Sequence, residues 1–153
     1  NPHVASAITI RQLLCHSSGL IDHYEYADRK SGTQFSDADA LNAVKSVDSL
    51  YFPAGRGYRY SNTAFCLLSQ IIEKVSGLSY PQYIRENIFK PLGMLKSDVI
   101  HPDLKIPDRA AGYQNENNHF ARSDAPENFF FSTMGDGGIY TSVNEYLKWI
   151  MAI

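Results

Sequence analysis

Cysteine is scarce in this chain, which has only two in 153 residues, Cys15 and Cys66. They lie far apart in the sequence and within apolar stretches, so we expect no disulfide framework. No CxxC pair and no zinc-ligand spacing occurs in the chain. The sequence pattern therefore gives no indication of a metal centre.

Excess charge and long apolar runs are also lacking. The formal net charge is −2, which gives no electrostatic basis for binding nucleic acid or an anionic membrane surface. No apolar run approaches the length of a membrane span. Residues 1–4 (NPHV) show neither a starting Met nor a signal-peptide pattern. We therefore expect a piece of a longer protein, and the chain leaves its compartment open.

Several common catalytic motifs are missing too. The GxSxG elbow of α/β hydrolases and the HExxH zinc motif are both absent. The glycine loop at residues 135–138 lacks the lysine and spacing of phosphate-binding loops, so we interpret it as a turn leading into a helix. Five scattered histidines are expected at the surface or at helix ends, with a further role considered only for His16. They are His3, His16, His23, His101 and His119.

What the chain does have is the composition of a globular domain. Apolar residues make up 44% and charged residues 20%, which suits a single domain with a substantial core. Four capping boxes predict helix starts at Thr9, Ser36, Ser79 and Ser142. A strongly amphipathic helix is predicted from Ser61 or Asn62 to Ser76.

The predicted bounds are as follows. The first helix ends near residues 16–19, with Gly19 just beyond its last turn. Leu41 and Val44 face inward on the second helix, which runs to about residue 46. The helix over residues 61–76 turns five apolar side chains inward and ends at Gly77; these are Phe65, Leu68, Ile71, Ile72 and Val75. We also predict a short strand at residues 110–113, an exposed turn at 115–118, and a last helix through Ile150.

The stretch at residues 52–62 (FPAGRGYRYSN) has two interpretations. Two glycines and a proline form a tight turn here, and Tyr58, Tyr60, Ser61 and Asn62 follow at the start of the amphipathic helix. Ser61 can simply cap the helix, and Tyr60 can be a phenol with one satisfied hydrogen bond. The phenol and the carboxamide can instead belong to a reaction site. The residues alone favour the structural interpretation, because short motif matches are weak evidence.

Five segments resemble, in order, the serine β-lactamase and penicillin-binding-protein-like hydrolases, which include class C β-lactamases, DD-peptidases and related esterases. Residues 8–20 (ITIRQLLCHSSGL) are similar to the TIRxLLxHTSGL segment of that family. Residues 51–62 are similar to its FxPGxxxxYSN segment, and residues 67–77 to the helix that follows. IFKPLGM at 88–94 and GGIYTS at 137–142 match its later signatures.

The resemblance implies roles for two residues. Tyr60 corresponds to the tyrosine that exchanges protons with the nucleophilic serine and the leaving group, and Asn62 to the amide that orients the substrate and the active-site lysine. Ser61 would then be structural. A phenol with an unperturbed pKa near 10 needs adjacent cations to act as a base near neutral pH, and the lysines of the family supply them. The family needs no metal or other cofactor.

The chain also departs from the family pattern. No serine has Lys three residues on, so the Ser-x-x-Lys nucleophile motif is absent, and so is the downstream Lys-Thr-Gly or His-x-Gly motif. The resemblance therefore implies one partial domain over residues 1–153. We expect it to be mainly α with short strands, the helical lobe of a β-lactamase-like (α + β) serine hydrolase without the sheet-forming ends.

For the full-length protein, the resemblance implies an acyl-enzyme hydrolase for a β-lactam, a D-Ala-D-Ala-type peptide or a small ester. The chain alone would be inactive and would self-associate through its exposed sheet-facing surface. The resemblance suggests a periplasmic, extracellular or membrane-associated protein, while the sequence itself leaves the localisation unknown.

Two alternatives stay open. One is a non-catalytic binding or scaffold module; an upstream Ser-x-x-Lys would favour the enzyme, and its absence would favour this module. The other uses Ser17 or Ser18 with His16 as a local nucleophile pair, which is disfavoured because adjacent residues on a turn rarely aim at each other.

Overall fold

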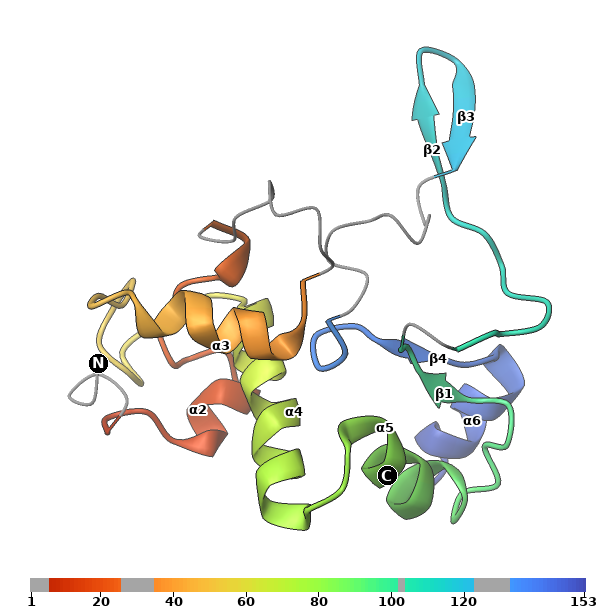
Figure 1. Ribbon diagram of the computed structural model, residues 1–153, viewed down its shortest axis with the longest axis horizontal. Helices are drawn as coiled ribbons and strands as arrows, with labels where there is room; N and C mark the ends of the chain where they lie inside the picture. The colour runs from red at the N-terminus through yellow and green to blue at the C-terminus, as the bar shows by residue number, and fades with distance from the viewer. Residues whose placement is uncertain (1–5, 26–34, 102–103, 123–132) are drawn as a thin grey trace.

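A computed structural model describes residues 6–25, 35–101, 104–122 and 133–153 (Figure 1). Its elements, in chain order, are α2 (Ile10–Leu14), η1 (His23–Glu25), α3 (Asp37–Lys45), α4 (Asn62–Ser76), α5 (Tyr80–Ile84), η2 (Arg85–Phe89), β1 (Asp98–Val99), β2 (Tyr113–Glu116), β3 (His119–Arg122), β4 (Ile139–Tyr140) and α6 (Val143–Ile150).

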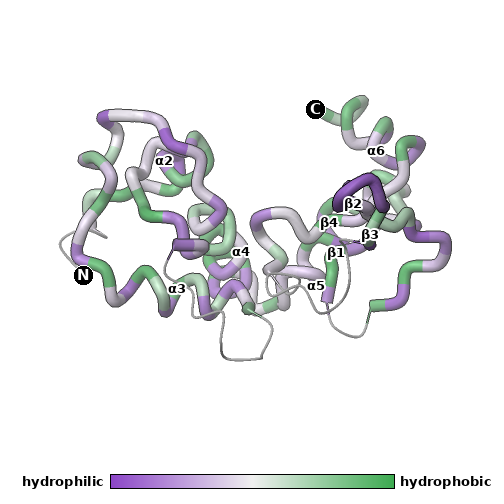
Figure 2. Tube along the Cα trace, turned by 90° about the horizontal axis from the view of Figure 1, so that it is seen from above, coloured by the Kyte–Doolittle hydropathy of each residue, from purple (hydrophilic) through white to green (hydrophobic). Residues whose placement is uncertain are grey.

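Helix α4 connects two groups of elements. It packs against α2 and α3 along its length and against α5 at its C-terminal end. Figure 2 shows α2, α3 and α4 together on one side and α5, α6, β1 and β4 on the other. No helix among the described residues is long and apolar enough to cross a membrane.

The four predicted capping boxes all start helices, but only two are complete. Thr9 with Gln12 and Ser36 with Asp39 form reciprocal pairs. Ser142 accepts a hydrogen bond from the Glu145 backbone N–H. The Glu145 carboxylate does not return the bond, because it accepts from the backbone N–H of Lys96 and the hydroxyl of Ser97. The bonds from Lys96 and Ser97 therefore replace the returning half of this capping box.

The predicted end of the first helix is wrong. Helix α2 stops at Leu14, Cys15 caps it, and His16 follows in the left-handed conformation with φ 53°. Gly19, predicted to lie just beyond the helix, is four residues past the cap and has φ 72°. Gly19 has another function: a Cβ atom there would lie 2.1 Å from the carbonyl oxygen of Phe52. This glycine therefore allows the 16–19 loop to approach the 52–62 stretch.

Helix α4 runs as predicted, from Asn62 to Ser76 with Gly77 at φ 73°, but its most buried face is different. The fully buried residues are Thr63, Ala64, Cys66 and Ser69, all small or weakly polar. The predicted apolar positions are only partly buried, and Val75 is 83% exposed. Small side chains occupy this face because α3 and the 133–138 loop approach the helix closely there.

The carboxylate of Asp37 joins these three elements. It accepts hydrogen bonds from the hydroxyl of Ser69 on α4 and from the backbone N–H groups of Met134, at 2.8 Å, and Gly135, at 3.1 Å. Asp37 is buried. A buried carboxylate of this kind is tolerated because several donors compensate for its lost hydration.

The second group of elements has its own apolar core. Tyr80, Ile84, Phe89, Met94 and Val99 are buried together, and Trp149 of α6 packs against them. Strands β1 and β4 pair antiparallel beside this core, with Val99 opposite Ile139.

The long segment before β4 contains a hairpin that the sequence predicted only in part. Strands β2 and β3 pair antiparallel. The turn is formed by Asn117 and Asn118, both with positive φ, as a two-residue hairpin requires. Of the strand predicted at 110–113 only Tyr113 is in β2, and Asn115 belongs to the strand rather than to the turn.

Candidate active site

The two motifs of the N-terminal half form one unit. Backbone N–H groups of Tyr51, Gly55 and Arg59 donate to carbonyl oxygens of Gly19, Ser17 and His16, at 2.8, 2.8 and 3.0 Å. The 52–62 stretch is therefore fixed along the 16–19 loop before it enters α4. This places the Tyr-Ser-Asn motif at a defined loop-to-helix junction.

Tyr60 lies at the surface of this junction, with its side chain 56% exposed. Its ring centroid is 4.5 Å from the imidazole of His16, which also lies 5.1 Å from the ring of Phe65. His16 accepts a hydrogen bond at Nδ1 from the backbone N–H of Ser61, at 3.2 Å. His16 thus contacts the motif through the Ser61 backbone and the Tyr60 ring, while the phenol of Tyr60 remains accessible.

Ser61 is buried and caps α4, because its Oγ accepts the backbone N–H of Ala64 at 3.2 Å. Its side chain therefore has a structural task. The same geometry disfavours the local pair of His16 with Ser17 or Ser18. Ser18 is buried with its Oγ accepting from Leu20 N–H, and the Nδ1 of His16 already faces Ser61.

Asn62 is held by a residue that the sequence did not single out. One carboxylate oxygen of Asp22, Oδ2, accepts from the backbone N–H of Asn62 at 2.8 Å and from its Nδ2 at 3.1 Å. The other oxygen accepts from the Tyr24 N–H at 3.1 Å. Asp22 lies two residues after the HSSGL segment (residues 16–20), and that proximity is the one clue the sequence offers.

The contact with Asp22 also orients the Asn62 amide. A carboxylate only accepts hydrogen bonds, so the NH₂ group of the amide must face it. The carbonyl oxygen of the Asn62 side chain therefore does not face Asp22. An amide fixed in this way can accept from a cationic donor and donate to a carbonyl group.

Tyr24 lies beside Asp22, to which it donates its backbone N–H. Burial raises the pKa of its phenol well above the ordinary value, and the nearby Asp136, Asp22, Cys66 and Tyr60 add to the effect. Tyr24 therefore stays protonated through the physiological pH range.

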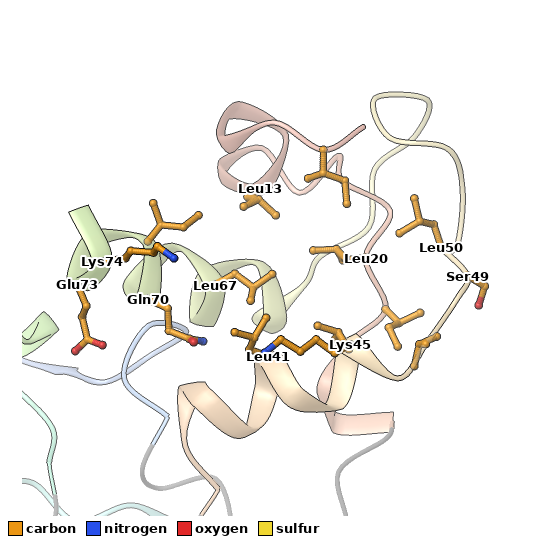
Figure 3. A pocket seen from close by; sticks show the side chains of 15 residues that line it. Leu13, Leu20, Leu41, Lys45, Ser49, Leu50, Leu67, Gln70, Glu73 and Lys74 are labelled. Carbon is orange, nitrogen blue, oxygen red and sulfur yellow. The ribbon is translucent and has the colours of Figure 1, made fainter. Parts of the chain in front are cut away.

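An apolar cavity lies away from this junction. It has a volume of about 730 Å³ and lies between α2, α3 and α4, where Leu13, Leu41 and Leu67 gather (Figure 3). Val44 also lines it, which agrees with the predicted inward face of α3. Neither Tyr60 nor Asn62 is part of its wall. The cavity therefore is not the place for chemistry at the Tyr-Ser-Asn motif.

The histidine predictions hold only in part. His23 is fully buried, so the expectation of a surface or capping position is wrong for it. His119 is exposed in β3, and His3 lies outside the described residues. The structure brings His23 together with Cys66 and Asp136, the one group of side chains among the described residues that could hold a metal ion.

A sequence model of the beta-lactamase family matches residues 1–153. The chain belongs to this family. The relatives it resembles include penicillin-binding protein 4* of Bacillus subtilis, 38% identical over 109 residues, with 69% of this chain and 24% of the relative covered. A D-aminopeptidase of Cereibacter sphaeroides is 33% identical over 154 residues, with 94% and 28% covered. The chain thus spans about a quarter of the length of these relatives.

Solved structures show that the fold is β-lactamase-like. A penicillin-binding protein from Bacillus halodurans superposes with a TM-score of 0.79 at 26% identity, covering 95% of this chain and 45% of that one. An octameric penicillin-binding protein homologue from Pyrococcus abyssi gives a TM-score of 0.73 at 27% identity, covering 94% and 34%.

Proposed function

We propose that this chain supplies the tyrosine and asparagine of a serine hydrolase that acts through an acyl-enzyme. The substrate classes are a β-lactam, a D-Ala-D-Ala-type peptide and a small ester. The observation that carries this proposal is the junction at the start of α4. There an exposed Tyr60 and a fixed Asn62 flank the buried cap Ser61, in a chain of the beta-lactamase family. The name of one relative, D-aminopeptidase, favours an amide substrate with a D-residue.

In the proposed reaction, the phenolate of Tyr60 takes the proton of a nucleophilic serine as that serine attacks the acyl carbon. The same phenol returns the proton to the leaving nitrogen or oxygen, and water then releases the acyl group. The serine and its lysine would come from a Ser-x-x-Lys segment outside this sequence. Asn62, oriented by Asp22, would bind the acyl-side amide of the substrate.

The same proposal covers the organisation of the protein. The described residues form two small antiparallel strand pairs and otherwise helices and loops, which supports a helical lobe that is completed by a sheet from other segments. By itself, this lobe would not turn over substrate, because a nucleophile and one wall of the cleft would be missing.

We also propose that the chain self-associates through α6. Four apolar side chains of α6 and that of its C-cap residue are about half exposed or more; they are Val143, Tyr146, Leu147, Ile150 and Met151. They follow the spacing of one helical face. The solved relative from Pyrococcus abyssi is described as octameric, which supports assembly as a property to test here.

The test uses the full-length protein with a D-amino acid amide, a chromogenic cephalosporin and an aryl ester as substrates. We expect Tyr60→Phe and Asn62→Ala each to lower kcat/KM by roughly 10²–10⁴-fold. Tyr58→Phe is the matched control, because it removes the same hydroxyl from an exposed tyrosine two residues away. It should keep kcat/KM within about twofold of the parent value.

Full activity of the Tyr60→Phe variant would exclude the proposed role. Absence of turnover, together with no covalent labelling by a fluorescent penicillin or a fluorophosphonate, would instead favour the non-catalytic binding module. Labelling at Ser17 or Ser18 would support the local nucleophile pair.

A further inference from the structure

Three potential metal ligands from distant parts of the chain lie close together in the structure. They are an imidazole nitrogen of His23 in η1, the Sγ of Cys66 in α4 and a carboxylate oxygen of Asp136 in the 133–138 loop. These atoms all lie within 4.8 Å of one another. His23 and Cys66 are fully buried and Asp136 is half-buried, so the cluster is protected but has one side toward solvent.

The backbone around the cluster is fixed on the first turns of α4. His23 donates its backbone N–H to the Thr63 hydroxyl at 2.7 Å, and its ring Nδ1 lies 3.0 Å from the same oxygen. Gly135 packs directly on the helix, since a Cβ there would lie 2.3 Å from the carbonyl oxygen of Phe65. Thr63 thus holds His23, and the glycine brings Asp136 to the turn that carries Cys66.

Thr63 also determines how the ring of His23 is presented. Histidines that bind metals are commonly held through the other ring nitrogen by a hydroxyl, carbonyl or carboxylate. With Nδ1 directed at Thr63, Nε2 would be the ligand atom. The ring of Phe35 stacks on the imidazole at 5.1 Å, which further limits its rotation.

The surrounding charge favours a cation. The carboxylate of Asp22 lies 3.8 Å from the Nδ1 of His23. The carboxylates of Asp37 and Asp22 also act electrostatically on Asp136 and Cys66. These nearby carboxylates would attract a divalent cation to the cluster.

We propose that His23, Cys66 and Asp136 form a zinc site. Imidazole, thiolate and carboxylate are the ligand types that zinc takes, and three protein ligands leave a fourth tetrahedral position for water or another molecule. Bonds of about 2.0–2.3 Å place tetrahedral ligand atoms roughly 3.3–3.8 Å apart. The side chains therefore need to move inward by about an ångström, and binding releases the Cys66 thiol proton to solvent.

The experiment uses the full-length protein, stripped of metal with a chelator and titrated with Zn²⁺ by calorimetry. Co²⁺ provides a second measurement, because a thiolate ligand gives a sulfur-to-cobalt charge-transfer band. We expect one zinc ion per chain. Cys66→Ser and Asp136→Asn should weaken binding at least roughly tenfold and abolish the band or alter its intensity. Cys15→Ser is the matched control, because Cys15 is the exposed cysteine outside the cluster.

Substitution of the buried Cys66 could weaken zinc binding simply by unfolding the protein, so a second pair of variants tests the site without changing a ligand. Thr63→Val removes the hydroxyl that holds His23 and should weaken zinc binding about tenfold, whereas Thr63→Ser should restore it. Circular dichroism confirms that each variant is folded. Failure of the parent protein to take up zinc, or equal uptake by the Cys66→Ser variant, would overturn the proposal and leave Cys66 as a buried structural thiol.

Discussion

At the scale of single residues, Asp22 links the two halves of the candidate site. Its Oδ2 atom accepts hydrogen bonds from the backbone N–H and from the side-chain Nδ2 of Asn62, while Oδ1 accepts one from the backbone N–H of Tyr24. One side chain therefore sets the direction of the Asn62 amide and holds the start of α4. Its neighbour His23 serves the zinc ligand cluster instead, so adjacent residues belong to two different groups.

Glu145 is the residue whose titration should be visible in stability. Burial would raise the pKa of its carboxyl, but hydrogen bonds from Ser97 and the Lys96 N–H, together with Lys148, outweigh burial and lower it. A group with a lowered folded-state pKa stabilises the fold above its unfolded value, near 4.5. That contribution disappears as the pH falls through the folded-state pKa.

We therefore expect Glu145→Gln to lower the free energy of unfolding at about pH 7 and to show a smaller difference from the parent chain at about pH 3, below the unfolded-state pKa. Urea unfolding at both pH values measures the two differences. Glu116→Gln, at an exposed position in β2, should follow the parent at both. A constant deficit of Glu145→Gln across this range would show that the carboxyl contributes through packing and not through its charge.

Single residues also show what local sequence can and cannot predict. Ser61, Thr9 and Ser36 were identified correctly as caps because a cap bonds to a backbone group only three residues away. Asp22 and His23 were missed because their partners lie about 40 residues further along the chain. No periodicity marks the loop that carries them, and zinc-ligand spacing cannot reveal ligands from three separate segments.

At the scale of elements, α4 organises the chain through its small side chains. The predicted apolar stripe placed the helix correctly in the sequence, yet the face that packs most tightly carries Ala64, Cys66 and Ser69. Periodicity predicts which residues are apolar on one side, but it does not show how closely a neighbour approaches. The 133–138 loop packs on this face of α4 because glycine at 135 allows close contact with the helix backbone.

Substitution of this glycine tests the close approach. A methyl group at Gly135 would meet the Phe65 carbonyl at 2.3 Å, so Gly135→Ala must displace the loop and its hydrogen bonds to Asp37. We expect a loss of roughly 2–3 kcal/mol in the free energy of unfolding. Gly137→Ala is the control, since a Cβ there meets no atom within 4 Å; it should change stability by less than about 0.5 kcal/mol. Equal effects of both substitutions in urea unfolding would argue against the close packing.

At the scale of the whole molecule, two groups of elements share α4, and α6 lies on the outer side of the second group (Figures 1 and 2). The inward side of α6 is formed by Glu145 and Trp149. Its apolar side chains at 143, 146, 147, 150 and 151 lie on the opposite side and are exposed. A helix with this pattern is most stable when a second surface covers the exposed apolar face.

Self-association through α6 makes a specific prediction for the 153-residue chain. Leu147, 55% exposed, should become buried between copies, so a lysine there would require burial of a charge. Burying a leucine contributes about 1.5–3 kcal/mol, and Leu147→Lys should therefore weaken association at least roughly tenfold. Val75→Lys provides the control, because it adds the same charge to an exposed apolar position on α4. Size-exclusion chromatography with light scattering across a dilution series measures both. A monomeric parent chain at every concentration, or equal weakening by the two lysines, would rule out α6 as the contact.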